Sequence, residues 1–79
     1  MMTEEEYHRK RLIKSLIEYP DWQSIRKDIR IQIMEDMMAE KDADKRNELF
    51  WEAQALDRLV GRLTSIANEV RIEEKSRAA

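Results

Sequence analysis

An apolar seam of three heptads runs through the second half of this sequence. Its members follow one another at spacings of four, three, four, three, four and three residues: Leu49, Ala53, Leu56, Val60, Leu63, Ala67 and Val70. This spacing is typical of a long α-helix with one apolar stripe. Such a helix is not stable alone in water, because the stripe must be buried against another surface. That surface belongs to the rest of the chain, to a second copy or to a different protein.

The composition favours long amphipathic helices over a β-sheet. The 79 residues are 41% charged and 42% hydrophobic, with one Gly, one Pro and no Cys. The apolar residues are clustered and periodic, which indicates a folded chain rather than a disordered one. The length predicts one small domain over residues 1–79, near the size at which a single core supplies only about 3–5 kcal/mol. The net charge of -2 gives no whole-chain reason to expect nucleic-acid binding.

A first helix is expected from about residue 4 to residue 18. Thr3 can cap its start, and Glu6 can close a capping box three residues later. The helix then ends at Tyr19, because a following proline disfavours the helical conformation of the residue before it. Pro20 itself is tolerated in the first turn of a new helix. We therefore expect a corner between two helices, not a linker.

Two further helices are expected, over about residues 21–40 and 44–75, with a polar turn between them. Residues 76–79 lose the apolar periodicity and are expected to fray. The fold class predicted is all-α: an antiparallel helical hairpin with an additional N-terminal helix. That helix could pack on Ala67 and Val70, since the third helix is too long to be covered by the second.

The register of the hairpin can be tested on the sequence. If the turn centres near residues 42–43, residues whose numbers sum to about 85 face each other. Every facing pair is then apolar: Met37 with Leu49, Ile33 with Ala53, Ile29 with Leu56, Ile25 with Val60, and Trp22 with Leu63. This match predicts that the seam packs inside the chain. The second helix is apolar over a wide arc, however, which suggests contact with a partner as well.

Enzyme chemistry has little support in this sequence. One His and no Cys exclude the usual metal and nucleophile sites, and the acidic residues are mostly spaced for ion pairs along exposed helices. Asp36 and Glu40 could in principle share a cation, but an ordinary solvated helical surface is the favoured interpretation. We expect no catalytic residue, cofactor or metal. No apolar run is long enough to span a membrane, so the expected location is the cytoplasm or an assembled particle.

A candidate partner interface lies on the side of the third helix opposite the seam. Trp51 falls there, either as an interface anchor or covered by neighbouring turns and arginines. Gly61 is costly within a helix, which suggests that another helix approaches it closely, although a tolerated surface glycine is also possible. The candidate interface comprises Phe50, Trp51, Arg58, Gly61 and Arg62.

The alternative function is nucleic-acid binding or regulation by the basic residues of the first two helices. Lysine and arginine on one helix face can follow a phosphate backbone. The candidate contacts are Arg9, Lys10, Arg11, Lys14, Arg26, Lys27 and Arg30. Acidic residues adjoin both clusters, at Glu4 to Glu6 and at Asp28, which favours an ion-paired surface instead.

Two segments resemble a known group of proteins. They are Leu16 to Trp22 (LIEYPDW) and Ala55 to Ile66 (ALDRLVGRLTSI), which includes the central Gly61. Together they resemble small helical-hairpin proteins encoded among the head and packaging genes of tailed bacteriophages. The resemblance implies a virion-assembly or virion-component role, without enzymatic activity, through contact with larger phage proteins. The sequence thus predicts a protein–protein interaction module that self-associates.

Overall fold

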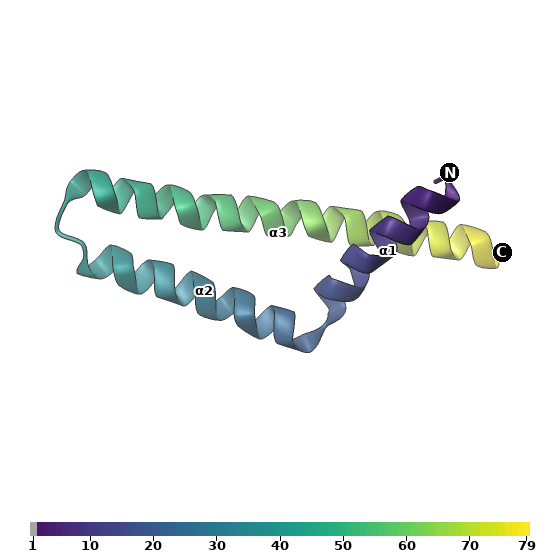
Figure 1. Cartoon of the computed structure of the whole chain (residues 1–79), viewed down its shortest axis with the longest axis horizontal. Coiled ribbons are helices and arrows are strands. Elements are labelled where there is room, and N and C mark those ends of the chain that lie inside the picture. The colour runs from purple at the N-terminus through teal and green to yellow at the C-terminus, as the bar shows by residue number, and fades with distance from the viewer. Residues whose placement is uncertain (1) are drawn as a thin grey trace.

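The computed structural model describes residues 2–79 and consists of three α-helices, with no strand among these residues. The helices are α1 (Glu4–Glu18), α2 (Pro20–Ala39) and α3 (Ala43–Ala78). They follow one another along the chain with only short connections, as Figure 1 shows. The prediction of an all-α chain with three helices is confirmed.

Local sequence signals account for the helix ends. The Thr3 hydroxyl accepts a hydrogen bond from the Glu6 backbone N–H at 3.1 Å, which caps α1. Pro20 is the first residue of α2, where its missing N–H costs nothing. The Asp42 carboxylate accepts from the backbone N–H groups of Asp44 and Lys45 at 2.9 and 3.1 Å, which caps α3. Each cap satisfies backbone donors that the first helical turn leaves free.

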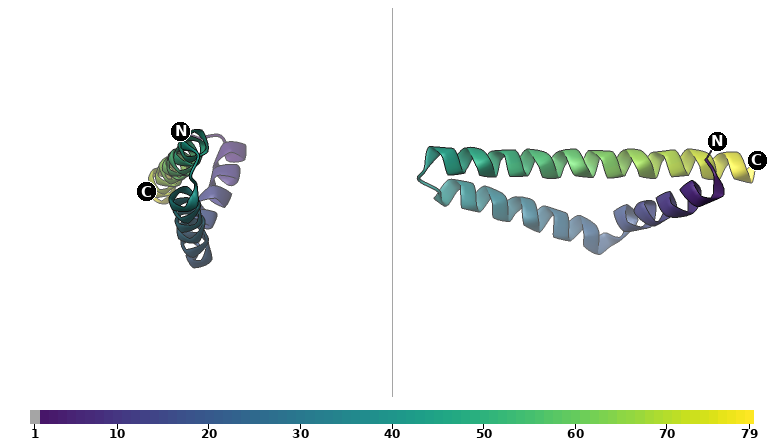
Figure 2. Two further views of the ribbon diagram at one scale, coloured as in Figure 1. Left: turned by 90° about the vertical axis from the view of Figure 1, so that its left-hand side faces the viewer. Right: turned by 45° about the horizontal axis from the view of Figure 1, so that its top comes forward.

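The longest helix, α3, forms the spine of the molecule. The Cα atoms extend 56 × 22 × 16 Å, and a helix of 36 residues accounts for about 54 Å of the longest dimension. Figures 1 and 2 show α2 lying along the first half of α3 and α1 along its second half. The two shorter helices form a shallow V whose apex, at Tyr19, stands away from α3.

The best-buried part of the core lies where α1 crosses α3. Ala67 and Val70 have no exposed surface there, and Ile17 of α1 is 8% exposed. As the sequence suggested, the N-terminal helix α1 packs on this part of α3. A second, smaller core lies between α2 and α3, where Ile33 and Ala53 are buried.

Two members of the predicted apolar stripe on α2 are not buried. Ile25 is 51% exposed and Ile29 is 42% exposed, although the sequence match placed them opposite Val60 and Leu56. The reason is the V-shaped course of α1 and α2. The distance between α2 and α3 widens towards the corner at Tyr19, as the ribbon in Figure 1 shows, so the N-terminal half of α2 is only partly covered.

The C-terminal end of α3 continues to Ala78, three residues past the predicted end. Arg77 forms ion pairs with Glu73, at 3.2 Å, and with Glu4 of α1. The Arg77 guanidinium also lies 3.9 Å from the ring centroid of Tyr7. These contacts join the two ends of the chain, and they provide a partner for Glu73, which is only 7% exposed.

Candidate functional site

The two aromatic residues of the candidate interface are exposed. Trp51 is 62% exposed and Phe50 is 43% exposed, and their rings meet edge to face with centroids 5.6 Å apart and planes at 70°. The structure therefore does not bury Trp51 under neighbouring turns. A large exposed aromatic pair is a feature that protein interfaces favour over free surfaces.

The remaining three residues of the candidate interface lie together. Arg58, Gly61 and Arg62 line an open depression on α3 with Ser65 and Ile66. A Cβ atom built on Gly61 would have no described atom within 4 Å. The close approach suggested by the sequence is therefore not made by the described residues of this chain, and Gly61 lies on an open surface.

Phe50 lies at a different hollow from this depression. It lines an open hollow at the turn, with Met37, Ala43, Arg46 and Asn47. Four of the five residues of the candidate interface therefore lie at two separate hollows: Phe50 near the turn, and Arg58, Gly61 and Arg62 further along α3. Trp51 stands exposed between them in the sequence and lines neither hollow.

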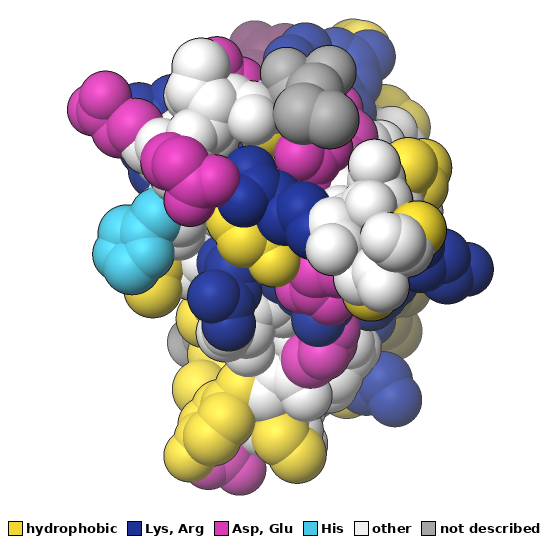
Figure 3. Space-filling view, turned by 90° about the vertical axis from the view of Figure 1, so that its right-hand side faces the viewer, with side chains coloured by type: hydrophobic (Ala, Val, Ile, Leu, Met, Phe, Trp, Pro, Cys, Tyr) yellow, Lys and Arg dark blue, Asp and Glu magenta, His cyan; other side chains and the backbone are white. Residues whose placement is uncertain are grey.

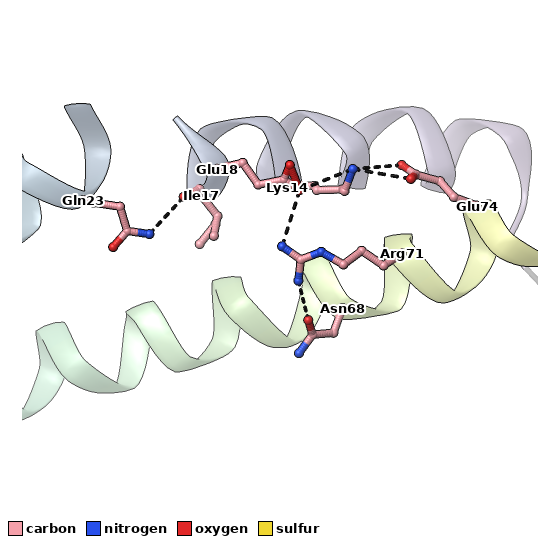
Figure 4. A network of polar contacts seen from close by, with 7 residues as sticks. All are labelled: Lys14, Ile17, Glu18, Gln23, Asn68, Arg71 and Glu74. Carbon is pink, nitrogen blue, oxygen red and sulfur yellow. Dashed lines mark hydrogen bonds and ion pairs between the residues drawn. The ribbon is translucent and has the colours of Figure 1, made fainter. Parts of the chain in front are cut away.

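Three of the seven candidate nucleic-acid contacts are held in ion pairs within the chain. Lys10 contacts Glu69 at 3.0 Å, and Lys14 contacts Glu18 and Glu74 at 3.3 and 3.4 Å. Figure 4 shows Lys14 reaching both carboxylates, with Glu18 also pairing with Arg71. The hydrogen bond with Glu18 raises the pKa of Lys14. These ion pairs of Lys10 and Lys14 join α1 to α3.

The third ion-paired contact is Arg30. Its Nε and Nη2 atoms donate to the two carboxylate oxygens of Asp57 at 3.1 and 3.0 Å. This two-pronged hydrogen bonding holds the pKa of Asp57 below its usual value and raises the pKa of Arg30. The pair joins α2 to α3. The Arg30 guanidinium, which nucleic-acid binding would use, is therefore hydrogen-bonded within the chain.

Other basic residues of the first two helices contact their own helices. The Arg11 guanidinium lies 5.6 Å from the ring centroid of Tyr7, and Arg26 donates to Gln23 at 3.1 Å. The Nε atom of Arg26 is buried without a hydrogen-bond partner among the described residues. Arg9 and Lys27 are exposed. Figure 3 shows basic and acidic side chains interspersed at the end where α1 meets α3, so that end presents no surface of one charge.

Residues 2–79 contain no group of three or more His, Asp or Glu side chains placed to hold a metal ion. Among the same residues, no helix is both long and apolar enough to cross a bilayer. The cluster of Tyr7, Glu73 and Arg77 was not predicted, because Glu73 lies in the part of the chain where the apolar periodicity ends.

Comparison with models of protein families, with curated proteins and with solved structures found no match to this chain.

Proposed function

We propose that this chain is a non-enzymatic protein–protein interaction module that associates with copies of itself. The observation that carries the proposal is the distribution of apolar side chains. Among residues 2–79, five apolar residues are buried, whereas twelve large hydrophobic side chains are at least 42% exposed. Single exposed hydrophobic residues are normal, but a surface this rich in them marks a site of association.

The scaffold of the module is an antiparallel hairpin of α2 and α3. The Arg30–Asp57 pair supports this arrangement, since it joins residues whose numbers sum to 87, close to the 85 expected from the sequence. The burial of Ile33 and Ala53 supports the same register. In this proposal the hairpin and α1 hold the exposed side chains in a rigid arrangement, which lowers the entropy cost of binding.

The biological role that we propose is virion assembly, or a place in the virion itself. The support for this role is the resemblance of Leu16 to Trp22 and of Ala55 to Ile66 to small phage head and packaging proteins. If the genes next to this one encode phage head proteins, mass spectrometry of purified virions of that phage tests the role. Detection of the protein in virions or in assembly intermediates is expected; its absence from both would refute the role.

Sedimentation velocity over a wide range of protein concentration tests the association. We expect the mass to rise above the monomer mass of 9.5 kDa with concentration, and to respond little to added duplex DNA. A chain that stays monomeric and binds DNA with an affinity that falls steeply with salt would refute the proposal and favour the nucleic-acid alternative.

The candidate interface is tested by Trp51→Ala. Because Trp51 is 62% exposed, the variant should keep its helical circular dichroism and its thermal unfolding. Binding of a larger virion protein through this surface should weaken, because tryptophan often anchors interfaces. Met38→Ala is the control, because Met38 is 86% exposed and lies on another helix. Loss of helical structure in Trp51→Ala would instead mean that the ring belongs to the core.

A further inference from the structure

One side of the α2–α3 pair is closed by a salt bridge. The other side carries α1 over the second half of α3 and is uncovered alongside α2. At 100° per residue, Arg30 lies about 60° to one side of the buried Ile33 on α2, whereas Ile29 and Ile25 lie about 40° and 80° to the other. Arg30 bonds to Asp57 of α3 and so marks the closed side. Ile25 and Ile29 therefore share the open side, which agrees with their exposure of 51% and 42%.

The same construction places apolar residues of α3 on the open side. On α3 we take as reference the direction in which the seam is buried near Ala53 and Leu56. Around the helix axis, Asp57 lies about 65° from that direction, towards the closed side. Leu59 lies about 95° in the opposite sense, and it is 50% exposed. Ile66 follows Leu59 by two helical turns on the same stripe. Ile25, Ile29, Leu59 and Ile66 thus form one surface across two helices, which we call the aliphatic face.

We propose that the aliphatic face binds the aliphatic face of a second copy of this chain, with a two-fold axis parallel to α2 and α3. The inference deepens the self-association proposed above and rests on it. In this dimer each α3 lies over the α2 of the other copy. Every helix of the resulting four-helix arrangement then has antiparallel neighbours, as in many soluble bundles.

Charge complementarity selects this partner and this axis. Arg62 borders the aliphatic face along α3, while Asp21 and Asp28 border it along α2. None of these three residues forms an ion pair within the described part of the chain. A two-fold axis parallel to the helices brings the basic border of each copy to the acidic border of the other. An axis across the helices would instead bring arginines against arginines, which is repulsive.

The register agrees with this pairing. Since Arg30 and Asp57 are level with each other, residues whose numbers sum to 87 lie level on the two helices. Arg62 is then level with Ile25 of the second copy, between its Asp21 and Asp28. The two carboxylates lie about 6 Å and 4.5 Å along the helix from that level, at 1.5 Å per residue. A single long arginine side chain can reach either of them.

The size of the face suits a dimer. The 20 residues of α2 span about 30 Å, and two adjacent helices are about 20 Å wide, so the flat area is roughly 600 Å². Stable interfaces bury about 800 Å² of accessible surface on each partner, and accessible surface exceeds the flat area because side chains project. The required burial is about one eighth of the 6282 Å² surface of the chain.

Two isoleucines of one helix provide a matched test. Ile25 is 51% exposed on the aliphatic face, and Ile31 is 54% exposed on the opposite side of α2. We expect Ile25→Gln to raise the dimer dissociation constant at least about tenfold, because both copies lose an anchor. Ile31→Gln should change it less than about twofold. Both variants should retain helical circular dichroism, and the dimer mass should be 19 kDa, twice 9.5 kDa.

A charge exchange tests the orientation. Arg62→Glu and Asp28→Arg should each weaken the dimer about threefold or more, and the double variant should recover most of the loss. A chain that is monomeric at all concentrations overturns both this inference and the proposed self-association. Association that responds equally to Ile25→Gln and Ile31→Gln overturns the aliphatic face alone. Charge variants whose losses simply add overturn the orientation.

Discussion

The stability of this chain should depend strongly on Val70, one of two residues among 2–79 without exposed surface. Val70→Ala removes two methyl groups from the core between α1 and α3. The transfer term is about 1.6 kcal/mol, at about 0.8 kcal/mol per buried CH₂ group, and the cavity adds about 1 kcal/mol. Alanine returns about 0.5 kcal/mol of helix propensity. The expected loss is therefore about 2 kcal/mol, a large part of the roughly 3–5 kcal/mol that such a core supplies.

Ile72→Ala is the control for this measurement. Ile72 lies two residues further along α3 and is 70% exposed, so the same helix-propensity gain applies with little loss of burial. We expect it to change stability by less than about 0.5 kcal/mol. Thermal unfolding followed by circular dichroism should show that Val70→Ala lowers the midpoint temperature by about 8–16 °C. All variants must be compared at one protein concentration, because self-association shifts the transition. Equal effects of the two substitutions would refute the packing of α1 over Val70.

Three further measurements follow from the structure. Gly61→Ala should raise the free energy of unfolding by up to about 1 kcal/mol, since its Cβ meets no described atom within 4 Å; a destabilised variant in urea titration would mean that the glycine backbone is needed. Asp57→Asn should remove part of the acid sensitivity of the fold. Because Arg30 lowers the pKa of Asp57 in the folded chain, the pair stabilises at neutral pH, and that contribution is lost as pH falls below about 4 through the lowered pKa; an unchanged difference between stabilities at pH 7 and pH 3 would contradict this. Leu56→Asp places a charge in the seam of α3 and should abolish helical circular dichroism at neutral pH, whereas a stable folded variant would refute the seam.

Charged side chains of this chain gather where α1 packs on α3. Its charged residues at the α1–α3 contact form ion pairs between the helices, as at Lys10 with Glu69 and at Glu18 with Arg71. Exposed pairs of this kind contribute little stability individually. Their arrangement nevertheless orients α1 on α3.

The helix boundaries were predictable because their causes are local. Thr3, Pro20 and Asp42 act on backbone groups within three residues, so each can be recognised from neighbouring letters. The apolar periodicity of α3 is equally local, and it predicts which side of that helix faces inward. Of the candidate interface, Arg58, Gly61 and Arg62 lie close together for the same reason, since they are neighbours on one helix.

Burial on α2 and at the C-terminal end was decided by packing between helices distant in sequence. Ile25 and Ile33 carry the same side chain and were predicted in the same stripe, yet Ile25 is 51% exposed and Ile33 only 5%. Glu73 is buried because Arg77 and Tyr7 meet there from opposite ends of the chain. Hydrogen bonds within a helix join residues four apart, so the signals that start and end a helix lie close together in the sequence. The burial of a side chain depends on how far apart two helices lie, and here that distance is determined by where α1 crosses α3.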